Sequence, residues 1–387
     1  MGELTKLGAD QAKSILLDAR MFGFSGIGTY LKNLLENYAR MECEFSFRLA
    51  CPRREPVQEF GSDRFTWVRA EAPIYSLAEQ WQIPRAAKGS DLLHCPHYNI
   101  PCFFRGRLLV TIHDLTHIVD RTFRRTLPSL VYARPILAIA SRKANHIVTD
   151  SEFIKRQIVN RLGVPPEKVT AIYLGVSSHF HAYDHEEAFQ ATSLALELER
   201  PYFLYIGTLK PHKNIPTLIR AFALLRGRRK VEHQLLIIGD DPKWKEGLVS
   251  LCSQLGIAAH VFFVPHVAFA TLPQVYAGAD LMVMPSFIEG FGLPVLEAMA
   301  CGTPVVCSRA ASLPEVAGDA AEYFEPTSVD DLVAALERVL GSRELQESLR
   351  RKGLERVKLF SWRECARRTL DVYRRVLEER FFGDLPS

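Results

Sequence analysis

Residues 286–308 have the sequence Ser-Phe-Ile-Glu-Gly-Phe-Gly-Leu-Pro-Val-Leu-Glu-Ala-Met-Ala-Cys-Gly-Thr-Pro-Val-Val-Cys-Ser, which contains the clearest indication of fold class in this chain. The apolar run 279–284 before it predicts a buried parallel strand. A short helix is expected at 295–300, closed by Gly302, where a left-handed residue is wanted. The chain then resumes as a strand at 303–307. This succession of strand, glycine-rich loop, short helix and strand is typical of a parallel α/β sheet.

Two carboxylates and a set of backbone amides surround the predicted helix start. The amides of residues 292–295 are expected to be unpaired, so that a diphosphate finds donors and a favourable dipole there. Either glutamate alone also fits an ordinary capping role. Carboxylates repel a bare phosphate but bind sugar hydroxyls, so the combination points to a nucleotide sugar. The residues expected to contact this ligand are Glu289, Gly290, Phe291, Gly292, Leu293, Pro294, Val295 and Glu297.

Strand-like and helix-like segments alternate along the chain, which predicts α/β architecture with parallel sheets covered by helices on both faces. The expected strands are 14–19, 108–112, 145–149 and 169–174 in the first half, and 202–209, 234–239, 261–264, 281–284 and 304–307 in the second. The expected helices are 27–38, 130–142, 215–225, 272–277, 331–340 and 344–358.

Two domains are expected, with boundaries set by composition. We place the first domain at 1–178 and the second at 201–360, joined by a charged interdomain linker at 179–200. The final segment, 361–387, contains an amphipathic helix. This helix either crosses back to the first domain or lies as an ordinary surface helix.

Bulk composition indicates a globular protein and excludes several other classes. Lys and Arg exceed Asp and Glu by 48 to 44, a surplus too small to indicate a nucleic-acid partner. The eight cysteines form no C-x-x-C pair and several lie in apolar runs. We therefore expect reduced thiols in a cytoplasmic protein without a signal peptide or membrane span. The cluster His94-Cys95-Pro96-His97 lacks a second ligand pair, so no metal site is expected.

Loops after other strands carry further candidates, because parallel sheets bind ligands at the carboxyl ends of their strands. Gly26 and Gly28 open a helix after the first strand and form either a binding loop or a plain tight turn. His113 follows a strand of the first half, where a structural hydrogen bond and a ligand contact are both open. Lys213 follows the first strand of the second half and offers a fixed cation to a diphosphate, although solvated lysines are common.

Together these motifs resemble those of the retaining GT-B glycosyltransferases of family 4. The signature of that family is two glutamates separated by seven residues, as Glu289 and Glu297 are. The segments His113-Asp114-Leu115 and Gly207–Asn214 match further family motifs. The resemblance is strongest to the mannosyltransferase-like subgroup of O-antigen and polysaccharide synthesis. It implies two doubly wound Rossmann-like domains whose parallel sheets face each other across a cleft.

The resemblance also implies a reaction, the retaining and metal-independent transfer of a hexose from a nucleoside diphosphate sugar. GDP-mannose is favoured over a UDP-hexose as donor, and no cofactor is implied. Lys213 would stabilise the departing diphosphate, and Glu289 would fix sugar hydroxyls. Glu297 would bind the ribose, and His113 would lie beside the reacting face of the sugar. Thr208 stands where many family members carry an arginine, which leaves Lys213 with less help on the diphosphate.

The acceptor is expected to be a saccharide or a lipid-linked saccharide. Arg121, Arg124 and Arg125 precede an apolar and basic stretch, 130–143. This stretch either rests on an anionic membrane, at the inner face of the plasma membrane, or packs on the first domain with its basic residues in water. Two rival functions stay open, a GT-B nucleotide-sugar epimerase and a catalytically silent nucleotide-sugar-binding protein. From its loop position, we expect Glu289→Ala to abolish transfer with little loss of folding.

Overall fold

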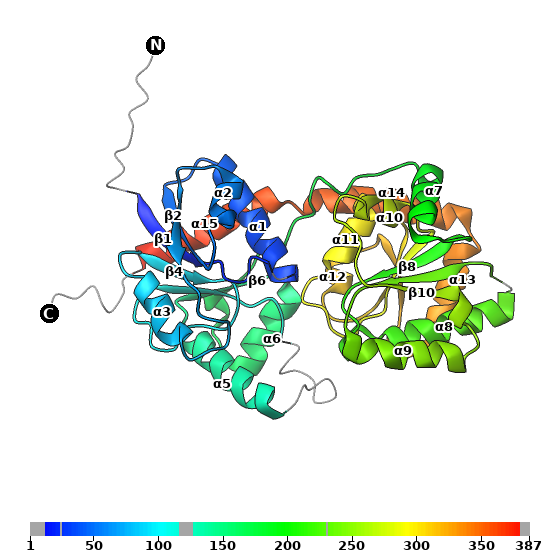
Figure 1. Ribbon diagram of the computed structural model, residues 1–387, viewed down its shortest axis with the longest axis horizontal. Coiled ribbons are helices and arrows are strands. Elements are labelled where there is room, and N and C mark those ends of the chain that lie inside the picture. Colours follow the sequence, from blue (N-terminus) through cyan, green and yellow to red (C-terminus); the bar gives the residue numbers. More distant parts are fainter. Residues whose placement is uncertain (1–11, 24, 116–126, 230, 380–387) are drawn as a thin grey trace, which may run out of the picture. The chain divides into compact units, whose positions relative to one another are not determined.

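The computed structural model describes residues 12–23, 25–115, 127–229 and 231–379 and divides the chain into two compact units (Figure 1). Unit 1 comprises residues 1–175 and 362–387, and unit 2 comprises residues 176–361. The chain therefore passes between the units twice. The segment that the sequence suggested as a linker, 179–200, belongs to unit 2 and forms a helix over more than half of its length. The arginines at 121, 124 and 125 lie outside the described residues.

Within the described residues, unit 1 contains a parallel sheet of seven strands in the order β3-β2-β1-β4-β5-β6-β7. The strands are β1 Lys13–Asp18, β2 Phe45–Cys51, β3 Phe65–Arg69, β4 Leu92–Cys95, β5 Leu108–Thr111, β6 His146–Thr149 and β7 Val169–Ala171. The central strands are continuous buried runs, because helices cover both faces of the sheet. The order runs outward from β1 to β3 and from β4 to β7. The topological switch point of this sheet thus lies between β1 and β4.

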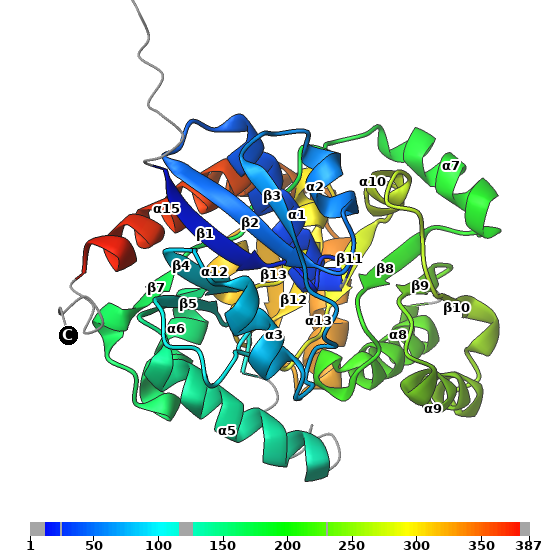
Figure 2. The ribbon, with the colours of Figure 1, turned by 60° about the vertical axis from the view of Figure 1, so that its left-hand side comes forward.

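The helices of unit 1 form two layers on this sheet. They are α1 Ser25–Arg40, α2 Glu55–Phe60, α3 Glu79–Ala86, α5 Leu127–Lys143, α6 Glu152–Leu162 and α15 Trp362–Glu378, with a 3-10 turn η1 at Pro166–Lys168. Figures 1 and 2 show α1, α2 and α15 on one face and α3, α5 and α6 on the other. One hydrophobic core joins the second layer to the sheet through Ile83, Ile136 and Ile154.

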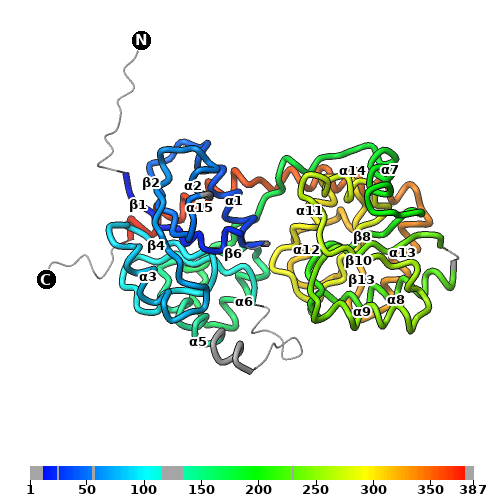
Figure 3. Tube along the Cα trace, viewed as in Figure 1, coloured from blue at the N-terminus to red at the C-terminus, as the bar shows by residue number. Residues whose placement is uncertain are grey.

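The last helix belongs to unit 1 although it follows unit 2 in the sequence. Figure 3 shows the red α15 in the same body as the blue start of the chain. It packs on α1, where Tyr373 lies near the stacked rings of Tyr38 and Phe47, whose centroids are 4.6 Å apart. Burying aromatic rings of this size stabilises the fold by roughly 2 kcal/mol each. The amphipathic face noted in the sequence is thus the face that closes unit 1.

His94 is a core residue. Its Nδ1 lies 2.7 Å from the hydroxyl of Tyr373, and its Nε2 lies 2.8 Å from Oγ1 of Thr111. Complete burial lowers the pKa of His94 to about 3, so the ring stays neutral. In the described part of the chain, no group of three or more His, Cys, Asp or Glu side chains is arranged to hold a metal ion.

Unit 2 contains, over the residues described, a parallel sheet of six strands in the order β10-β9-β8-β11-β12-β13. The strands are β8 Tyr202–Ile206, β9 Gln234–Ile238, β10 Val261–Val264, β11 Leu281–Met284, β12 Val305–Ser308 and β13 Ala321–Phe324. The helices are α7 His185–Leu196, α8 Ile215–Arg229, α9 Pro242–Gln254, α10 Leu272–Ala277, α11 Leu293–Ala300, α12 Leu313–Ala317, α13 Val329–Leu340 and α14 Arg343–Arg356, with 3-10 turns η2 Pro211–Lys213, η3 Ala258–His260 and η4 Val357–Leu359. Its switch point lies between β8 and β11.

Every strand and helix expected from the sequence is present, with ends that differ by a few residues. The structure adds strands at both outer edges, namely β2 and β3 in unit 1 and β13 in unit 2, together with β4 in the centre of unit 1. No helix within the described ranges has the length and hydropathy to cross a membrane. Both units therefore have the predicted doubly wound α/β architecture.

Candidate active site

The loops after β8 and β11 leave the sheet of unit 2 on either side of its switch point. Two contacts join these loops. The side-chain amide of Asn214 donates to the carbonyls of Pro285 and Pro326 at 3.0 and 2.8 Å. The amide of Phe287 donates to the carbonyl of His212 at 2.8 Å. Because these bonds hold the η2 turn against the β11 loop, the side chains at the end of one loop meet those of the other.

Lys213 and Glu289 form a direct ion pair at this place. The ammonium of Lys213 donates to Oε1 and Oε2 of Glu289 at 2.7 and 2.8 Å. The two side chains are only 18% and 9% exposed. Ser286, which is fully buried, donates a further hydrogen bond to Oε1 of Glu289 at 2.6 Å. An ammonium carries three N–H donors, so one donor of Lys213 remains for a ligand.

The burial of Glu289 changes the expectation for Glu289→Ala. The sequence suggested a loop residue whose loss leaves folding intact. In the structure its carboxylate is paired inside the protein, so truncation leaves the ammonium of Lys213 without this partner. Removing one member of a buried pair destabilises a protein. We therefore expect a loss of stability as well as of activity, and Glu289→Gln is the better probe.

The backbone of the Glu289–Gly292 loop is held in place by hydrogen bonds from Ser312. The hydroxyl of Ser312 lies 3.0 Å from the carbonyl oxygens of both Glu289 and Phe291, to which it donates. Gly292 has φ 104°, which favours glycine, and a Cβ there would lie 2.9 Å from Cδ2 of Leu313. The loop that presents the carboxylate is therefore preformed. Gly290 and Phe291 contribute its backbone, and the Phe291 ring is buried.

The start of α11 offers fewer amides than the sequence suggested. The amide of Val295 already donates to the carbonyl of Gly292 at 3.0 Å. Pro294 has no amide hydrogen. Of the four residues 292–295, only Gly292 and Leu293 can therefore present an amide to an anion. The prediction of an unpaired amide at Val295 was wrong, because a tight first turn pairs this amide within the loop. Gly302 has φ 79°, as the predicted helix end requires.

Glu297 is held by a different partner. The hydroxyl of Tyr276 donates to Oε2 of Glu297 at 2.7 Å. Burial raises the pKa of Glu297 from 4.5 to about 7, and the Tyr276 hydrogen bond opposes this only in part. Tyr276 is fully buried between α10 and α11. At neutral pH, Glu297 is thus close to half protonated and can both donate and accept hydrogen bonds.

Thr208 lies where the loop after β8 touches the loop after β9. A Cβ on Gly239 would lie 1.9 Å from the carbonyl oxygen of Gly207, so the close approach of the two loops requires glycine at position 239. The buried hydroxyl of Tyr205 donates to the carbonyl of Thr208 at 2.8 Å. Thr208 therefore has a fixed backbone and a short, uncharged side chain. Lys213 supplies the cationic charge that Thr208 lacks.

In unit 1, His113 follows β5 and pairs with Asp150, which follows β6. Nδ1 of His113 lies 2.7 Å from Oδ2 of Asp150, and Nε2 lies 3.0 Å from the carbonyl of Pro96. Burial alone would lower the pKa of His113, but the Asp150 carboxylate and the Pro96 carbonyl hold it above its ordinary value. Both ring nitrogens face oxygen atoms, so the protonated ring can donate to both, and the raised pKa favours that form. Tyr30 packs edge-on against the ring, with centroids 4.9 Å apart.

The two glycines of unit 1 lie within the first turn of α1, which begins earlier than the sequence suggested. A Cβ on Gly28 would lie 2.3 Å from the carbonyl oxygen of Phe22, whereas a Cβ on Gly26 would meet nothing within 4 Å. Gly28 therefore permits the close approach of a helix to the preceding loop. Gly26 has no such packing role.

The predicted site residues thus fall into two groups, each within its own unit. Unit 1 holds Gly26, Gly28 and His113, and unit 2 holds all the others. Of the unit 2 residues, Lys213 and Glu289 are in direct contact. The supporting residues Asn214, Ser286 and Ser312 were not predicted. Asn214 ends the Gly207–Asn214 motif and Ser286 begins the stretch 286–308, but neither residue type by itself indicates a supporting role, and Ser312 lies outside both motifs.

Two family models match almost the whole chain. The model described as Glycosyltransferase Family 4 matches residues 24–180, and the model described as Glycosyl transferases group 1 matches residues 186–356. The O-antigen chain mannosyltransferase B of Escherichia coli is 32% identical over 295 residues, which cover 73% of this chain and 74% of the relative. The chain belongs to glycosyltransferase family 4. It spans only about half the length of several other curated relatives that it matches.

This family 4 chain is similar in structure to two solved proteins that are informative here. Sucrose-phosphate synthase from Thermosynechococcus elongatus has a TM-score of 0.74 at 22% identity, covering 94% of this chain and 99% of that one. HepE from Anabaena in complex with UDP-glucose has a TM-score of 0.76 at 18% identity, with the same coverage. At such identities the likeness establishes the fold, which is GT-B.

Proposed function

We propose that this chain transfers a hexose from a nucleoside diphosphate sugar to a hydroxyl of a saccharide or lipid-linked saccharide, with retention of configuration and without a metal ion. The observation that carries the proposal is the Lys213–Glu289 pair at the switch point of the unit 2 sheet. Membership of family 4 gives the reaction class, and this pair gives it a chemical basis.

Charge stabilisation is the main task of such a site. As the bond between sugar and diphosphate breaks, negative charge grows on the departing phosphate. The remaining N–H of Lys213 and the amides of Gly292 and Leu293 are fixed donors that stabilise this charge without reorganisation. Lys213 also provides the positive charge that a metal ion provides in other transferases, which is the reason for proposing that none is needed.

The carboxylate of Glu289 is suited to binding hydroxyls. It already accepts two hydrogen bonds from Lys213 and one from Ser286, so about one of its roughly four lone-pair sites remains for a sugar hydroxyl, and the carboxylate is a weak nucleophile. This favours direct attack by the acceptor over a covalent glycosyl intermediate. Glu297 is proposed to bind the ribose, and His113 of unit 1 is proposed to contact the sugar through its imidazolium edge.

The donor and the setting are proposed from the relatives. Similarity to the O-antigen chain mannosyltransferase B of E. coli supports a mannosyl donor, for which we propose GDP-mannose, and the HepE complex with UDP-glucose keeps a UDP-hexose as the second candidate. We propose synthesis of a cell-surface polysaccharide on the cytoplasmic side, with peripheral association to an anionic membrane.

A panel of nucleotide sugars tests the proposal. The protein is incubated with GDP-mannose and UDP-hexoses, with and without saccharide acceptors, and products are followed by NMR. Transfer with an α-linked product from an α-linked donor supports the proposal. Interconversion of free nucleotide sugars would show an epimerase, and binding without turnover would show a silent protein. Glu289→Gln serves as the active-site variant, and Glu232→Gln, on an exposed ion pair with Arg200, serves as its control.

A further inference from the structure

The exposed apolar side chains of unit 1 gather in one place. Among the side chains of residues 12–23, 26–54, 57–115, 134–175 and 362–379 of unit 1, the large hydrophobic ones that remain exposed are Tyr75, Leu77, Trp81 and Phe103. Three of them lie on α3 or in the loop just before it, and Phe103 lies in the loop after β4. Exposed hydrophobic residues are usually scattered singly, so a cluster indicates an interaction surface.

The centre of this cluster is an aromatic pair on a rigid support. The rings of Trp81 and Phe103 are 64% and 70% exposed and lie 6.4 Å apart. Beneath them, the buried side chain of Gln80 accepts a hydrogen bond from the amide of Cys102 at 2.6 Å and donates to the carbonyl of Ile100 at 3.3 Å. These bonds join α3 to the loop that carries Phe103. The two rings are therefore held toward solvent by the fold.

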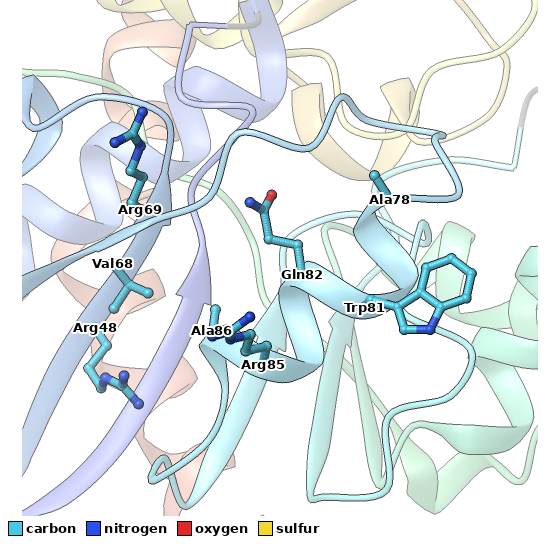
Figure 4. A pocket seen from close by; sticks show the side chains of 8 residues that line it. All are labelled: Arg48, Val68, Arg69, Ala78, Trp81, Gln82, Arg85 and Ala86. Carbon is cyan, nitrogen blue, oxygen red and sulfur yellow. The ribbon is translucent and has the colours of Figure 1, made fainter.

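A basic pocket of about 550 Å³ adjoins this pair. Figure 4 shows Arg48 and Val68 on the strands at one side of it and Gln82 and Arg85 on α3 at the other. The pocket exists because α3 leaves the outer strands β2 and β3 uncovered on this face of the sheet. The rest of its lining is Arg69, Ala78, Trp81 and Ala86.

The three arginines of the pocket differ in their hydrogen bonds and ion pairs within the protein. Arg48 donates through Nη1 to the carbonyl of Lys88 and to Oγ of Ser90. Arg69 is paired with the exposed Glu71. Arg85 is exposed and has no ion pair among the residues described. One acidic side chain thus faces three guanidinium groups, and the pocket keeps a net positive charge.

We propose that this α3 surface docks the protein on an anionic lipid bilayer. Arg85, with Arg48 and Arg69, binds lipid phosphate groups in the pocket, since guanidinium matches phosphate oxygens in a bidentate manner. Trp81 and Phe103 lie in the boundary between head groups and acyl chains, where aromatic rings are favoured. The charge of the pocket selects an anionic surface over a neutral one. This inference rests on the membrane association included in the proposed function.

The surface differs from the segment that the sequence suggested for this role. That segment included Arg121, Arg124 and Arg125, which lie outside the described residues, whereas all residues of the α3 surface lie within them. Two other partners would match part of the α3 surface. A second copy of the chain would cover the aromatic pair, and a soluble acidic saccharide would fill the pocket.

Vesicle sedimentation of the full chain tests the docking. Wild-type protein is mixed with phosphatidylcholine vesicles with and without phosphatidylglycerol, at low and high salt. We expect binding only to the anionic vesicles, weakened by salt. Arg85→Glu should lower the partition coefficient at least about fivefold, and Trp81→Ser with Phe103→Ser about tenfold or more. The matched controls are Leu194→Ser, at an 86% exposed site in unit 2, and Arg351→Glu, at an exposed site of α14, and both should bind as wild type.

A second readout places Trp81 at the lipid. Brominated lipids should quench tryptophan fluorescence of the wild type but not of Trp81→Phe. Equal sedimentation of all variants, undiminished quenching in Trp81→Phe, or no binding by the wild type would overturn the proposal. A change from dimer to monomer in Trp81→Ser would also overturn it and would assign the surface to a second copy of the chain. If Arg85→Glu lost binding of a soluble acidic saccharide but kept vesicle binding, the pocket would be assigned to the saccharide and the proposal would fail. Calorimetry of donor binding with the same variants keeps the two proposals separate, because donor affinity should not change in any of them.

Discussion

Replacing Lys213 by methionine removes the ammonium while keeping most of the side chain's volume. Glu289 then retains Ser286 but loses two hydrogen bonds of 2.7 and 2.8 Å. A fully buried pair costs about 3–5 kcal/mol when one partner is removed, and an exposed pair costs about 0–1 kcal/mol. Exposures of 18% and 9% place this pair nearer the buried limit. We expect a loss of about 2–3 kcal/mol in the free energy of unfolding.

Combining Lys213→Met with Glu289→Gln removes both charges and should recover much of that loss. The double-mutant cycle, measured by chemical denaturation, should give a coupling energy of about 2 kcal/mol. The surface pair of Arg338 and Glu322 provides the comparison, because its side chains are more exposed and its coupling should stay below about 1 kcal/mol.

The two single variants should change the affinity for a nucleoside diphosphate in different ways. Lys213→Met should weaken binding of a free nucleoside diphosphate about 10- to 100-fold, the value of a hydrogen bond to a charged group. Glu289→Gln frees the same ammonium and removes a nearby negative charge, so it should bind the free nucleoside diphosphate at least as tightly as the wild type. Its transfer rate should nevertheless fall by about 100-fold or more, since a hydroxyl contact present in the transition state is lost.

Isothermal calorimetry with the nucleoside diphosphate and steady-state transfer assays measure these effects. A coupling energy no larger than that of the surface pair, together with unchanged diphosphate affinity in Lys213→Met, would refute the reasoning. Weaker diphosphate binding in Glu289→Gln would contradict the assignment of Glu289 to the sugar.

Three further outcomes are expected. Because the folded pKa of Glu297 is raised from 4.5 to about 7, the stability that its neutral form contributes is present below pH 4.5 and is lost, by about 3 kcal/mol, as pH rises through 7. Chemical denaturation as a function of pH should show this loss, and Glu297→Gln should abolish it. The raised pKa of His113 means that its pairing with Asp150 stabilises the fold at pH 6.5 and weakens as pH rises through the folded pKa of the ring, and it is also lost at acid pH, where Asp150, whose pKa burial raises, becomes protonated. NMR titration of the ring should show a lower pKa in Asp150→Asn, and an unchanged one would contradict the pairing. Gly28→Ala should cost about 2 kcal/mol or more because its Cβ meets backbone, whereas Gly26→Ala should melt close to the wild type, and equal melting temperatures for the two would refute the packing argument.

Most strands could be predicted, including the edge strands β7 and β10, whereas β2, β3 and β13 could not. Strands β8 and β11 are buried apolar runs ended by glycine or proline, so their pattern is clear. Strand β2 contains Arg48 and strand β3 contains Thr66 and Arg69, because one face of these edge strands is not fully covered. Helix α7 was assigned to a linker because its first turn is rich in charge, yet those acids favour a helix start, and Asp184 caps it.

The site could be predicted as a set of residues but not as a set of contacts. The sequence indicated Lys213 and Glu289 separately, from the strand ends on which they lie. Their ion pair joins residues 76 positions apart and depends on Asn214, which holds one loop against the other. Asn214 has φ 57°, a conformation that asparagine tolerates better than most residues. Such a local conformation with long-range effects leaves little trace in the pattern of apolar residues.

The structure also explains how two carboxylates can lie beside an anion site. From the sequence, Glu289 and Glu297 both carry a negative charge that repels a diphosphate. In the folded protein, Lys213 balances the charge of Glu289, and the raised pKa of Glu297 removes about half of its charge at neutral pH. The site is therefore nearly neutral before the donor binds. In the proposed reaction the diphosphate takes the free donor of Lys213, while Glu289 keeps its two bonds to the same ammonium and offers its remaining lone pair to a sugar hydroxyl. Diphosphate binding and sugar binding are thus coupled through one ammonium group.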